Sequence, residues 1–172
     1  MRSIYKLVVC SLLTLSITSC EKDLLDKEQY QKEIYLIGAY NRVWTTEVSY
    51  SNEEVKTYFT VSSSGTLALD RDVNVKMKIN EELVDIYNKK YWTVLNEDKY
   101  YKSLDTYLYS IPSLENTVIK HAEGISAEVP VLIKTASLKI DQSYVIPVEI
   151  ESTTGYPIST SGCKMLVLLK LK

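Results

Sequence analysis

His121 is the single histidine of this 172-residue sequence, so any catalysis that needs an imidazole base would have to use it. It lies just before a turn predicted at residues 123–124, which makes an exposed turn residue the simpler interpretation. The sequence contains no Gly-x-Ser-x-Gly elbow, phosphate-binding loop or dinucleotide fingerprint. A zinc site would lack ligands, because His121 and Cys163 lie far apart in the chain.

A second candidate for chemistry is a calcium-like spacing of oxygen ligands. Asp70, Asp72 and Asn74 fall at the first three ligand positions of a helix-loop-helix calcium site, and Glu81 falls at the twelfth. The sixth position is a valine, however, where such a loop needs glycine for its sharp turn. Residues 73–79 also alternate between apolar and polar side chains, as a strand does. We therefore predict no metal site.

Paired carboxylates are the remaining catalytic candidates, because glycosidases need only two acids at a set separation. Glu53-Glu54 and Glu81-Glu82 are neighbouring pairs of this kind. Adjacent residues on a strand point to opposite faces, and neighbouring acids usually face water. A small domain with two tryptophans also has little room for a deep cleft. We predict that the chain is not an enzyme and has no catalytic residue and no cofactor.

Aromatic side chains offer a binding site instead. The chain has 14 tyrosines against one phenylalanine, and several gather in its least regular part. The candidate ligand-binding residues are Tyr91, Trp92, Tyr100, Tyr101, Tyr107 and Tyr109. Flat aromatic faces can stack on sugar rings, and loops on a rigid scaffold commonly carry binding sites. The alternative is that these tyrosines simply pack on half-buried surfaces.

Cys20 follows a segment with the pattern of a secretory signal. Arg2 and Lys6 precede a mostly apolar run at residues 7–15, which is shorter than the ~20 apolar residues of a spanning helix. Residues 17–20 then give an aliphatic residue, two small residues and cysteine, which looks like the lipobox of bacterial lipoproteins. The alternative is an ordinary cleaved signal with an accidental cysteine.

Cleavage before Cys20 and acylation of its thiol would anchor the chain, since each buried CH₂ contributes ~0.8 kcal/mol. The predicted organisation is then a signal peptide (1–19), a lipidated tether (20–32) and a β-sandwich domain (33–172). Cys163 would have no disulfide partner, and we expect it to be a small buried hydrophobic residue. Removing the signal lowers the formal net charge from −2 by two further units, and no basic cluster indicates a nucleic-acid partner.

The elements that would position these residues are mostly strands, because apolar and polar residues alternate after residue 33. The predicted strands cover residues 33–37, 43–50, 55–61, 73–79, 116–120, 129–133, 144–150 and 164–172. Many short strands with regular turns predict an immunoglobulin-like antiparallel β-sandwich.

One short helix is predicted after the central 73–79 strand. Asn80 can cap it, and Leu83, Ile86 and Tyr87 fall on one helical face. Residues 91–115 are predicted to form a long loop with a short helix at Lys99–Leu108.

The order of these elements resembles domain of unknown function 1735, a β-sandwich at the front of many Bacteroidota surface lipoproteins. The segments that carry the resemblance are Ile34-Tyr35-Leu36, the Val73–Ile79 strand with the following Tyr87-Asn88, Val118-Ile119 with Glu123-Gly124, Ala127–Ile133 with Leu138, and Tyr144–Ile150 with the last apolar strand. Together they cover most of residues 34–171. The sequence departs from the family pattern after the helix, where Leu95-Asn96 stands in place of a Leu-Pro followed by tyrosine.

This resemblance implies an outer-membrane address, with the lipid on Cys20 as the anchor and the domain facing outward. Residues 21–26 are rich in acids, which resembles a surface-export signal, and a solvated acidic tether is the alternative. Family members often carry a second domain, such as a glycan-binding module or a glycosidase. This chain ends with the sandwich, so we expect its role to lie there or in a partner protein.

We therefore expect a non-catalytic outer-membrane lipoprotein that binds a glycan or serves a polysaccharide-uptake system. Its expected partners are the membrane, a glycan, and partner lipoproteins or a transporter. One alternative is a structural or adhesive cell-envelope lipoprotein of the pilus-accessory type. Another is an accessory domain that supports an enzyme in a partner chain.

Overall fold

The computed structural model describes residues 30–65 and 67–172. The predicted signal peptide of residues 1–19 and the predicted lipidation site Cys20 lie outside these described residues. Residues 31–64 and 68–172 form one compact unit. No helix in the described part of the chain is long and apolar enough to cross a membrane.

The elements of this unit follow one another as a series of strands, with one α-helix and three short 3-10 turns (η) among the described residues. In chain order they are β1 (Ile34–Leu36), η1 (Ala39–Asn41), β2 (Val43–Val48), β3 (Glu54–Ser63), β4 (Val73–Ile79), α3 (Glu82–Tyr91), η2 (Val94–Lys99), β5 (Lys102–Ser103), η3 (Thr106–Leu108), β6 (Tyr109–Ser110), β7 (Thr117–Ile119), β8 (Ser126–Lys134), β9 (Tyr144–Thr153) and β10 (Lys164–Leu171).

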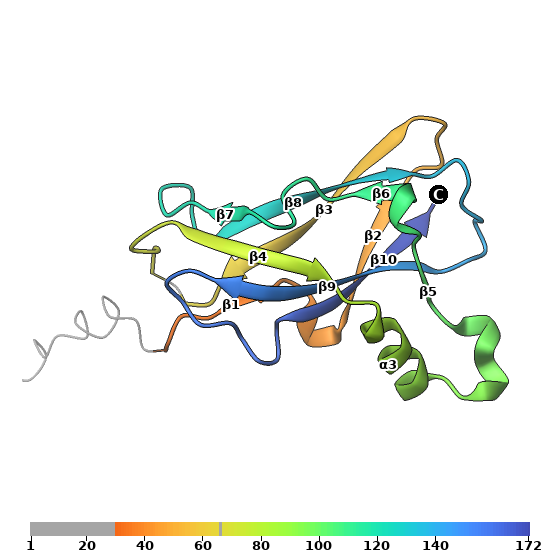
Figure 1. Cartoon of the computed structure of the whole chain (residues 1–172), viewed down its shortest axis with the longest axis horizontal. Helices are drawn as coiled ribbons and strands as arrows, with labels where there is room; N and C mark the ends of the chain where they lie inside the picture. The colour runs from red at the N-terminus through yellow and green to blue at the C-terminus, as the bar shows by residue number, and fades with distance from the viewer. Residues whose placement is uncertain (1–29, 66) are drawn as a thin grey trace, which may run out of the picture. The chain divides into compact units, whose positions relative to one another are not determined.

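The strands form two sheets that pack as a sandwich (Figure 1). The first sheet has the order β1-β3-β8-β6 and is antiparallel throughout. The second sheet has the order β2-β10-β9-β4-β7, with β5 also paired to β9. The main core lies between the sheets, where Val73, Val75 and Met77 of β4 are buried and the residues between them are exposed. The predicted sandwich is therefore confirmed, and the alternation that predicted it is the pattern of burial.

Two strand pairs differ from the predicted antiparallel arrangement. β2 runs parallel to β10, and β5 runs parallel to β9. The first difference arises at η1, which leads the chain out of β1 in the first sheet and into β2 in the second. Gly38 precedes η1 with a φ of 88°, a left-handed conformation that glycine adopts without steric penalty.

The predicted helix is confirmed as α3, and two residues of its predicted face, Leu83 and Tyr87, pack against the second sheet while Ile86 does not. Asn80 contributes to its start, because the Asn80 Oδ1 accepts a hydrogen bond from the Glu82 N–H at 3.1 Å. The buried side chains are Val84 and Asn88, whereas Ile86 of the predicted face is 52% exposed. Val84 packs in a second small cluster with Val145 of β9 and Leu166 of β10, which fixes the helix to one end of the second sheet (Figure 1).

The short helix predicted at Lys99–Leu108 is wrong. Strand β5 lies in the middle of that range, with the 3-10 turn η3 behind it. The Lys102 N–H bonds to Ser143 O at 3.0 Å and the Leu104 N–H bonds to Val145 O at 2.9 Å. Leu104 is also buried in the main core. These backbone groups are therefore used by the edge of β9 and are not available for helical hydrogen bonds.

Cys163 is half-buried, where we predicted a buried residue. It packs against the main core just before β10, and its Sγ lies 3.7 Å from Thr160 O. The turn that precedes β10 leaves one side of the thiol open to solvent.

Candidate functional site

The residues of the calcium-like spacing are engaged with partners on the protein itself. Arg71 Nε and Nη2 each lie 2.9 Å from an oxygen of Asp70, and the Tyr156 hydroxyl donates to the same carboxylate at 2.5 Å. The hydrogen bonds from Arg71 and Tyr156 hold the pKa of Asp70 well below its usual range. No group of three or more His, Cys, Asp or Glu side chains in the described ranges is placed to hold a metal ion.

His121 is an exposed turn residue, as predicted, and it pairs with Asp72. Its Nδ1 lies 2.6 Å from Asp72 Oδ1, and its backbone N–H donates to the same oxygen at 3.0 Å. Both side chains are 53% exposed. The hydrogen bonds from His121 lower the pKa of Asp72. We refer to Asp70, Arg71, Asp72, His121 and Tyr156 as the acidic edge, since they lie where β4 begins and β7 ends.

The paired glutamates face solvent. Glu53, Glu54, Glu81 and Glu82 are all exposed, and none of them lines either of the two main pockets of the described residues. Glu81 and Glu82 lie at the start of α3, where acids favourably oppose the positive end of the helix dipole.

Two of the six predicted aromatic residues come together around a third tyrosine. The rings of Tyr87 and Tyr101 stack with centroids 5.2 Å apart and an interplanar angle of 11°. Tyr91 lies against the same Tyr87 ring at 4.4 Å, tilted by 36°. Burial raises the pKa of Tyr87 to about 12, with a further contribution from Tyr101. We call these three residues the tyrosine stack.

Asn88 positions the tyrosine stack. Its side chain is buried, its Nδ2 donates to Tyr101 O at 2.9 Å, and its Oδ1 accepts from the Tyr101 N–H at 3.0 Å. One amide thus satisfies both backbone groups of Tyr101 and holds the 100–101 segment against α3. Sequence reasoning missed Tyr87 as a site residue and missed the role of Asn88. The helical spacing of Leu83 and Tyr87 was the signal that could have found the former.

The other four predicted aromatic residues are not part of the stack. Trp92 is half-buried with Lys99 Nζ 5.8 Å from its ring centroid, and Tyr100 is half-buried too. Tyr107 is 71% exposed on η3. Tyr109 packs against the main core and is paired with Ile133 in the first sheet, and burial raises its pKa to about 12. Proximity in sequence therefore did not produce one site.

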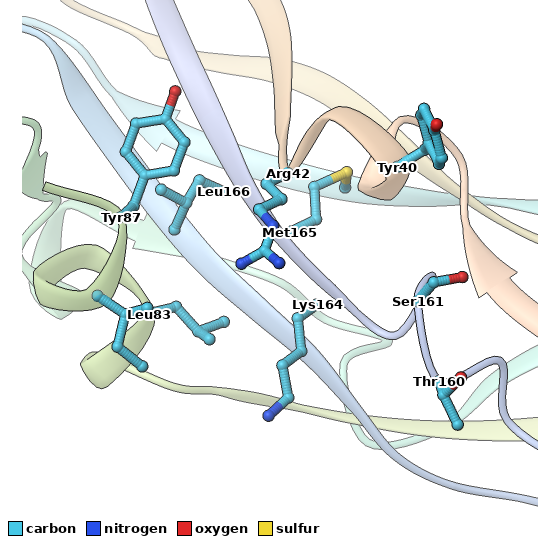
Figure 2. A pocket seen from close by; sticks show the side chains of 10 residues that line it. Tyr40, Arg42, Leu83, Tyr87, Thr160, Ser161, Lys164, Met165 and Leu166 are labelled. Atoms are coloured by element: carbon cyan, nitrogen blue, oxygen red, sulfur yellow. The ribbon is translucent and has the colours of Figure 1, made fainter. Parts of the chain in front are cut away.

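A pocket of about 320 Å³ lies beside the tyrosine stack, over one end of the second sheet (Figure 2). It is formed by η1 and the start of β2, by α3, and by β10 with the turn before it. The residues that line it are Tyr40, Arg42, Leu83, Ile86, Tyr87, Thr160, Ser161, Lys164, Met165 and Leu166. We call this the α3 pocket. Tyr87 belongs to both the pocket and the tyrosine stack, so the two features form one continuous surface.

The chemistry of the α3 pocket is mixed. Leu83, Ile86 and Leu166 supply an apolar surface, while Thr160 and Ser161 supply hydroxyl groups. Arg42 and Lys164 supply positive charge, and no carboxylate lines the pocket. Such a combination can hold a small polar molecule that has both apolar and hydroxyl-bearing faces.

Backbone contacts fix the part of the pocket that comes from η1. The Arg42 N–H donates to Ala39 O at 2.8 Å, and Arg42 O accepts from the Leu166 N–H at 2.8 Å. The parallel pairing of β2 with β10 continues directly from this second bond, with Val43 opposite Leu166. Arg42 and Lys164, from opposite ends of the described chain, therefore meet on one surface.

Comparisons with known proteins address the fold of this chain. A protein-family model described as a “-like, N-terminal domain” matches residues 30–157. A search of the curated proteins gives no match. A multidomain protein from Bacteroides ovatus that includes domain of unknown function 1735 matches 76% of this chain and 40% of its own, at 18% identity and a TM-score of 0.58.

Two further solved structures share the fold. A candidate carbohydrate-binding protein from Bacteroides ovatus matches 80% of this chain and 36% of its own, at 18% identity and a TM-score of 0.61. An auxiliary nutrient binding protein from Bacteroides thetaiotaomicron matches 78% of this chain and 44% of its own, at 14% identity and a TM-score of 0.58. The chain spans less than half the length of each of these three proteins.

Proposed function

Because the chain belongs to this N-terminal domain family, we propose that its sandwich is a non-catalytic carbohydrate-binding domain. A multidomain protein that includes domain of unknown function 1735 shares its fold. The observation that carries the proposal is the continuous surface of the α3 pocket and the tyrosine stack. Tyr87 joins the two, because it lines the pocket beside Leu83 and Leu166 (Figure 2) and its ring also lies against Tyr91 and Tyr101.

The dimensions and chemistry of this surface suit a sugar. A volume of about 320 Å³ is at the small end of the range for ligand pockets, and it fits one or two sugar rings. Sugar rings have apolar C–H faces that pack on tyrosine and hydroxyl rims that hydrogen-bond polar groups. Tyr40 is 91% exposed at the opposite rim of the pocket from α3 and offers a second aromatic face.

Solved structures that share the fold support the same proposal. Proteins that share the sandwich include a candidate carbohydrate-binding protein and an auxiliary nutrient binding protein. We further propose that a lipid on Cys20 anchors the domain to the outer membrane, facing outward. In that position it would capture glycans for a polysaccharide-uptake system with partner lipoproteins or a transporter.

A glycan array tests the proposal, using the chain from residue 21 onward, which retains the whole compact unit. We expect binding to a defined set of glycans. Tyr40→Ala and Tyr87→Ala should each lower the affinity by about tenfold or more, because each variant loses one aromatic contact with the sugar ring. Tyr107→Ala is the matched control, since Tyr107 is exposed but lies outside the pocket and the stack. A blank array, or equal losses in all three variants, would reject the proposal.

A second candidate function is protein contact, in an adhesive or assembly role. Val94 and Leu95 at the start of η2 are 76% and 88% exposed, although both are large aliphatic side chains. Exposed apolar groups that lie together are typical of interaction surfaces. In a pull-down from the native envelope, Leu95→Glu should release a protein partner if this role is the main one, and it should leave glycan binding unchanged.

A further inference from the structure

We infer that the α3 pocket selects an acidic sugar, and that Arg42 is the residue that binds its anionic group. This inference rests on the proposed carbohydrate-binding function and names the ligand class for the same site. The observation behind it is a guanidinium that has no side-chain partner among the described residues, in a pocket lined by no acidic residue.

The guanidinium of Arg42 is available for a ligand. Arg42 is exposed and lines the pocket, and its side chain makes no hydrogen bond or ion pair with any residue in the ranges 30–65 and 67–172. Figure 2 shows the guanidinium extending from the start of β2 toward the side of the pocket where Leu83 and Lys164 lie. By contrast, the Arg71 guanidinium at the acidic edge is held by both oxygens of Asp70.

Lys164 is a second donor whose charge is already shared. Its Nζ lies 3.2 Å from Glu149 Oε1, and the Asn80 amide donates to the other oxygen of that carboxylate at 2.5 Å. Burial opposes ionisation of Glu149, but these two hydrogen bonds lower its pKa, so the carboxylate stays charged and keeps Lys164 in place. Within the described part of the chain, Arg42 is therefore the pocket cation whose charge no carboxylate compensates.

The backbone at Arg42 supports a role for its side chain. Arg42 has a φ of 63°, and it is the one non-glycine residue with positive φ among those described. This left-handed conformation is unfavourable for a residue with a Cβ and favours glycine or asparagine. Local folding therefore gives no reason for arginine here, whereas a guanidinium held at the pocket rim does.

A carboxylate-bearing sugar matches this arrangement. The planar guanidinium binds a carboxylate through two parallel hydrogen bonds, and it binds a sulfate ester by the same donors. Thr160 and Ser161 can bond ring hydroxyls while Tyr40 and Tyr87 pack on the ring faces. The whole chain has a formal charge of −2, so general attraction of polyanions would not imitate a specific site.

Matched acidic and neutral polymers test the inference by isothermal titration calorimetry, with the chain from residue 21 onward. The first pair is polygalacturonate and its fully methyl-esterified form, and the second is dextran sulfate and dextran. We expect the acidic member of one pair to bind at least tenfold more tightly than its neutral partner, and the pair identifies a carboxylate or a sulfate. Arg42→Gly should reduce that affinity by about ten- to a hundredfold, because a charge-assisted hydrogen-bond pair is lost.

The variant is informative because glycine suits the left-handed backbone at position 42, so its unfolding midpoint should be unchanged or higher. Arg71→Gly is the control, since it removes the same charge at the acidic edge and should leave the affinity unchanged. Equal binding of acidic and neutral polymers, or no effect of Arg42→Gly, overturns the inference and leaves the proposed function standing. Absence of binding to all four polymers together with a blank glycan array overturns both.

Discussion

The α3 pocket and the acidic edge both gather charged side chains on the second sheet, but their charges are used differently. At the acidic edge, Asp70 is bound by Arg71 and Tyr156, and Asp72 is bound by His121. In the α3 pocket, Arg42 has no such partner among residues 30–65 and 67–172, and Tyr40 and Tyr87 line the same pocket. The charges of the acidic edge are therefore used within the protein, where they link the start of β4 to the end of β7 and to Tyr156 beyond β9. The charge of Arg42 is available for a ligand.

A ligand-like spacing of acids in the sequence did not produce a metal site among the described residues. Asp70, Asp72 and Asn74 have ligand-like spacing, and that spacing is a by-product of a strand that begins at Val73. The acids flank the start of the strand and find partners on the neighbouring segments. The α3 pocket has no sequence motif, and its residues meet only because β2 pairs with β10.

Loss of the Asn88 amide, which holds the tyrosine stack beside the α3 pocket, should destabilise the protein most. Asn88→Ala should lower the free energy of unfolding by about 3 kcal/mol, because two buried hydrogen bonds are lost and both backbone groups of Tyr101 lose their partner. Chemical denaturation followed by tryptophan fluorescence measures this change. Asn74→Ala, at an exposed position of β4, is the matched control and should change stability little.

A stability loss confined to Asn74→Ala, with Asn88→Ala unchanged, would show that the tyrosine stack does not depend on this amide. It would also mean that the 100–101 segment is held to α3 by its aromatic rings alone.

Gly38 lies in the turn that leads to the α3 pocket, and Gly124 lies in the turn next to the acidic edge. Gly38 and Gly124 both have positive φ, but a Cβ at Gly38 would lie 2.7 Å from Trp44 Cε3, whereas nothing lies within 4 Å of one at Gly124. Gly38→Ala should therefore cost about 2 kcal/mol from strain and overlap, and Gly124→Ala about 1 kcal/mol from strain alone. Thermal unfolding measures both changes.

Gly38→Ala should also weaken glycan binding, because Tyr40 and Arg42 follow directly from this turn. Gly124→Ala should leave binding intact, since its turn carries His121 and the acidic edge. Loss of binding in both variants would indicate that the two regions are coupled.

How much of this could be predicted from sequence depended on whether the pattern was local. The strand β4 and the helix α3 were predicted from their own periodicity, because each repeats within a few residues. The site could not be predicted in that way, since Arg42 and Lys164 approach through a parallel pairing of distant strands. Tyr109 is the reverse case. It lies close to Tyr101 in the sequence, but it belongs to the first sheet and not to the tyrosine stack.

A third prediction uses the raised pKa of Tyr87. Burial and the neighbouring Tyr101 raise its pKa to about 12, above its ordinary value of 10. An acid whose pKa is raised by folding contributes stability below its unfolded pKa and loses that contribution as pH rises. Stability should therefore fall between pH 10 and about 12, and Tyr87→Phe should reduce the fall. The difference in ultraviolet tyrosinate absorbance between the two proteins measures the pKa directly, and a value near 10 would show that the stack is open to solvent.

Changes at the acidic edge should have the least effect, because its ion pairs are exposed to solvent. The bond from His121 lowers the pKa of Asp72, so its contribution to stability is present above the unfolded pKa of about 4 and is lost as pH falls through the lower folded value. Because the pair is exposed and screened, Asp72→Asn should leave the neutral-pH unfolding midpoint nearly unchanged, and the small difference from wild type should vanish in acid. Glycan binding should not change at all, since neither residue lines the α3 pocket. If Asp72→Asn abolished binding while Arg42→Gly did not, the acidic edge would be the binding site, and its paired charges would be a resting state that the ligand opens.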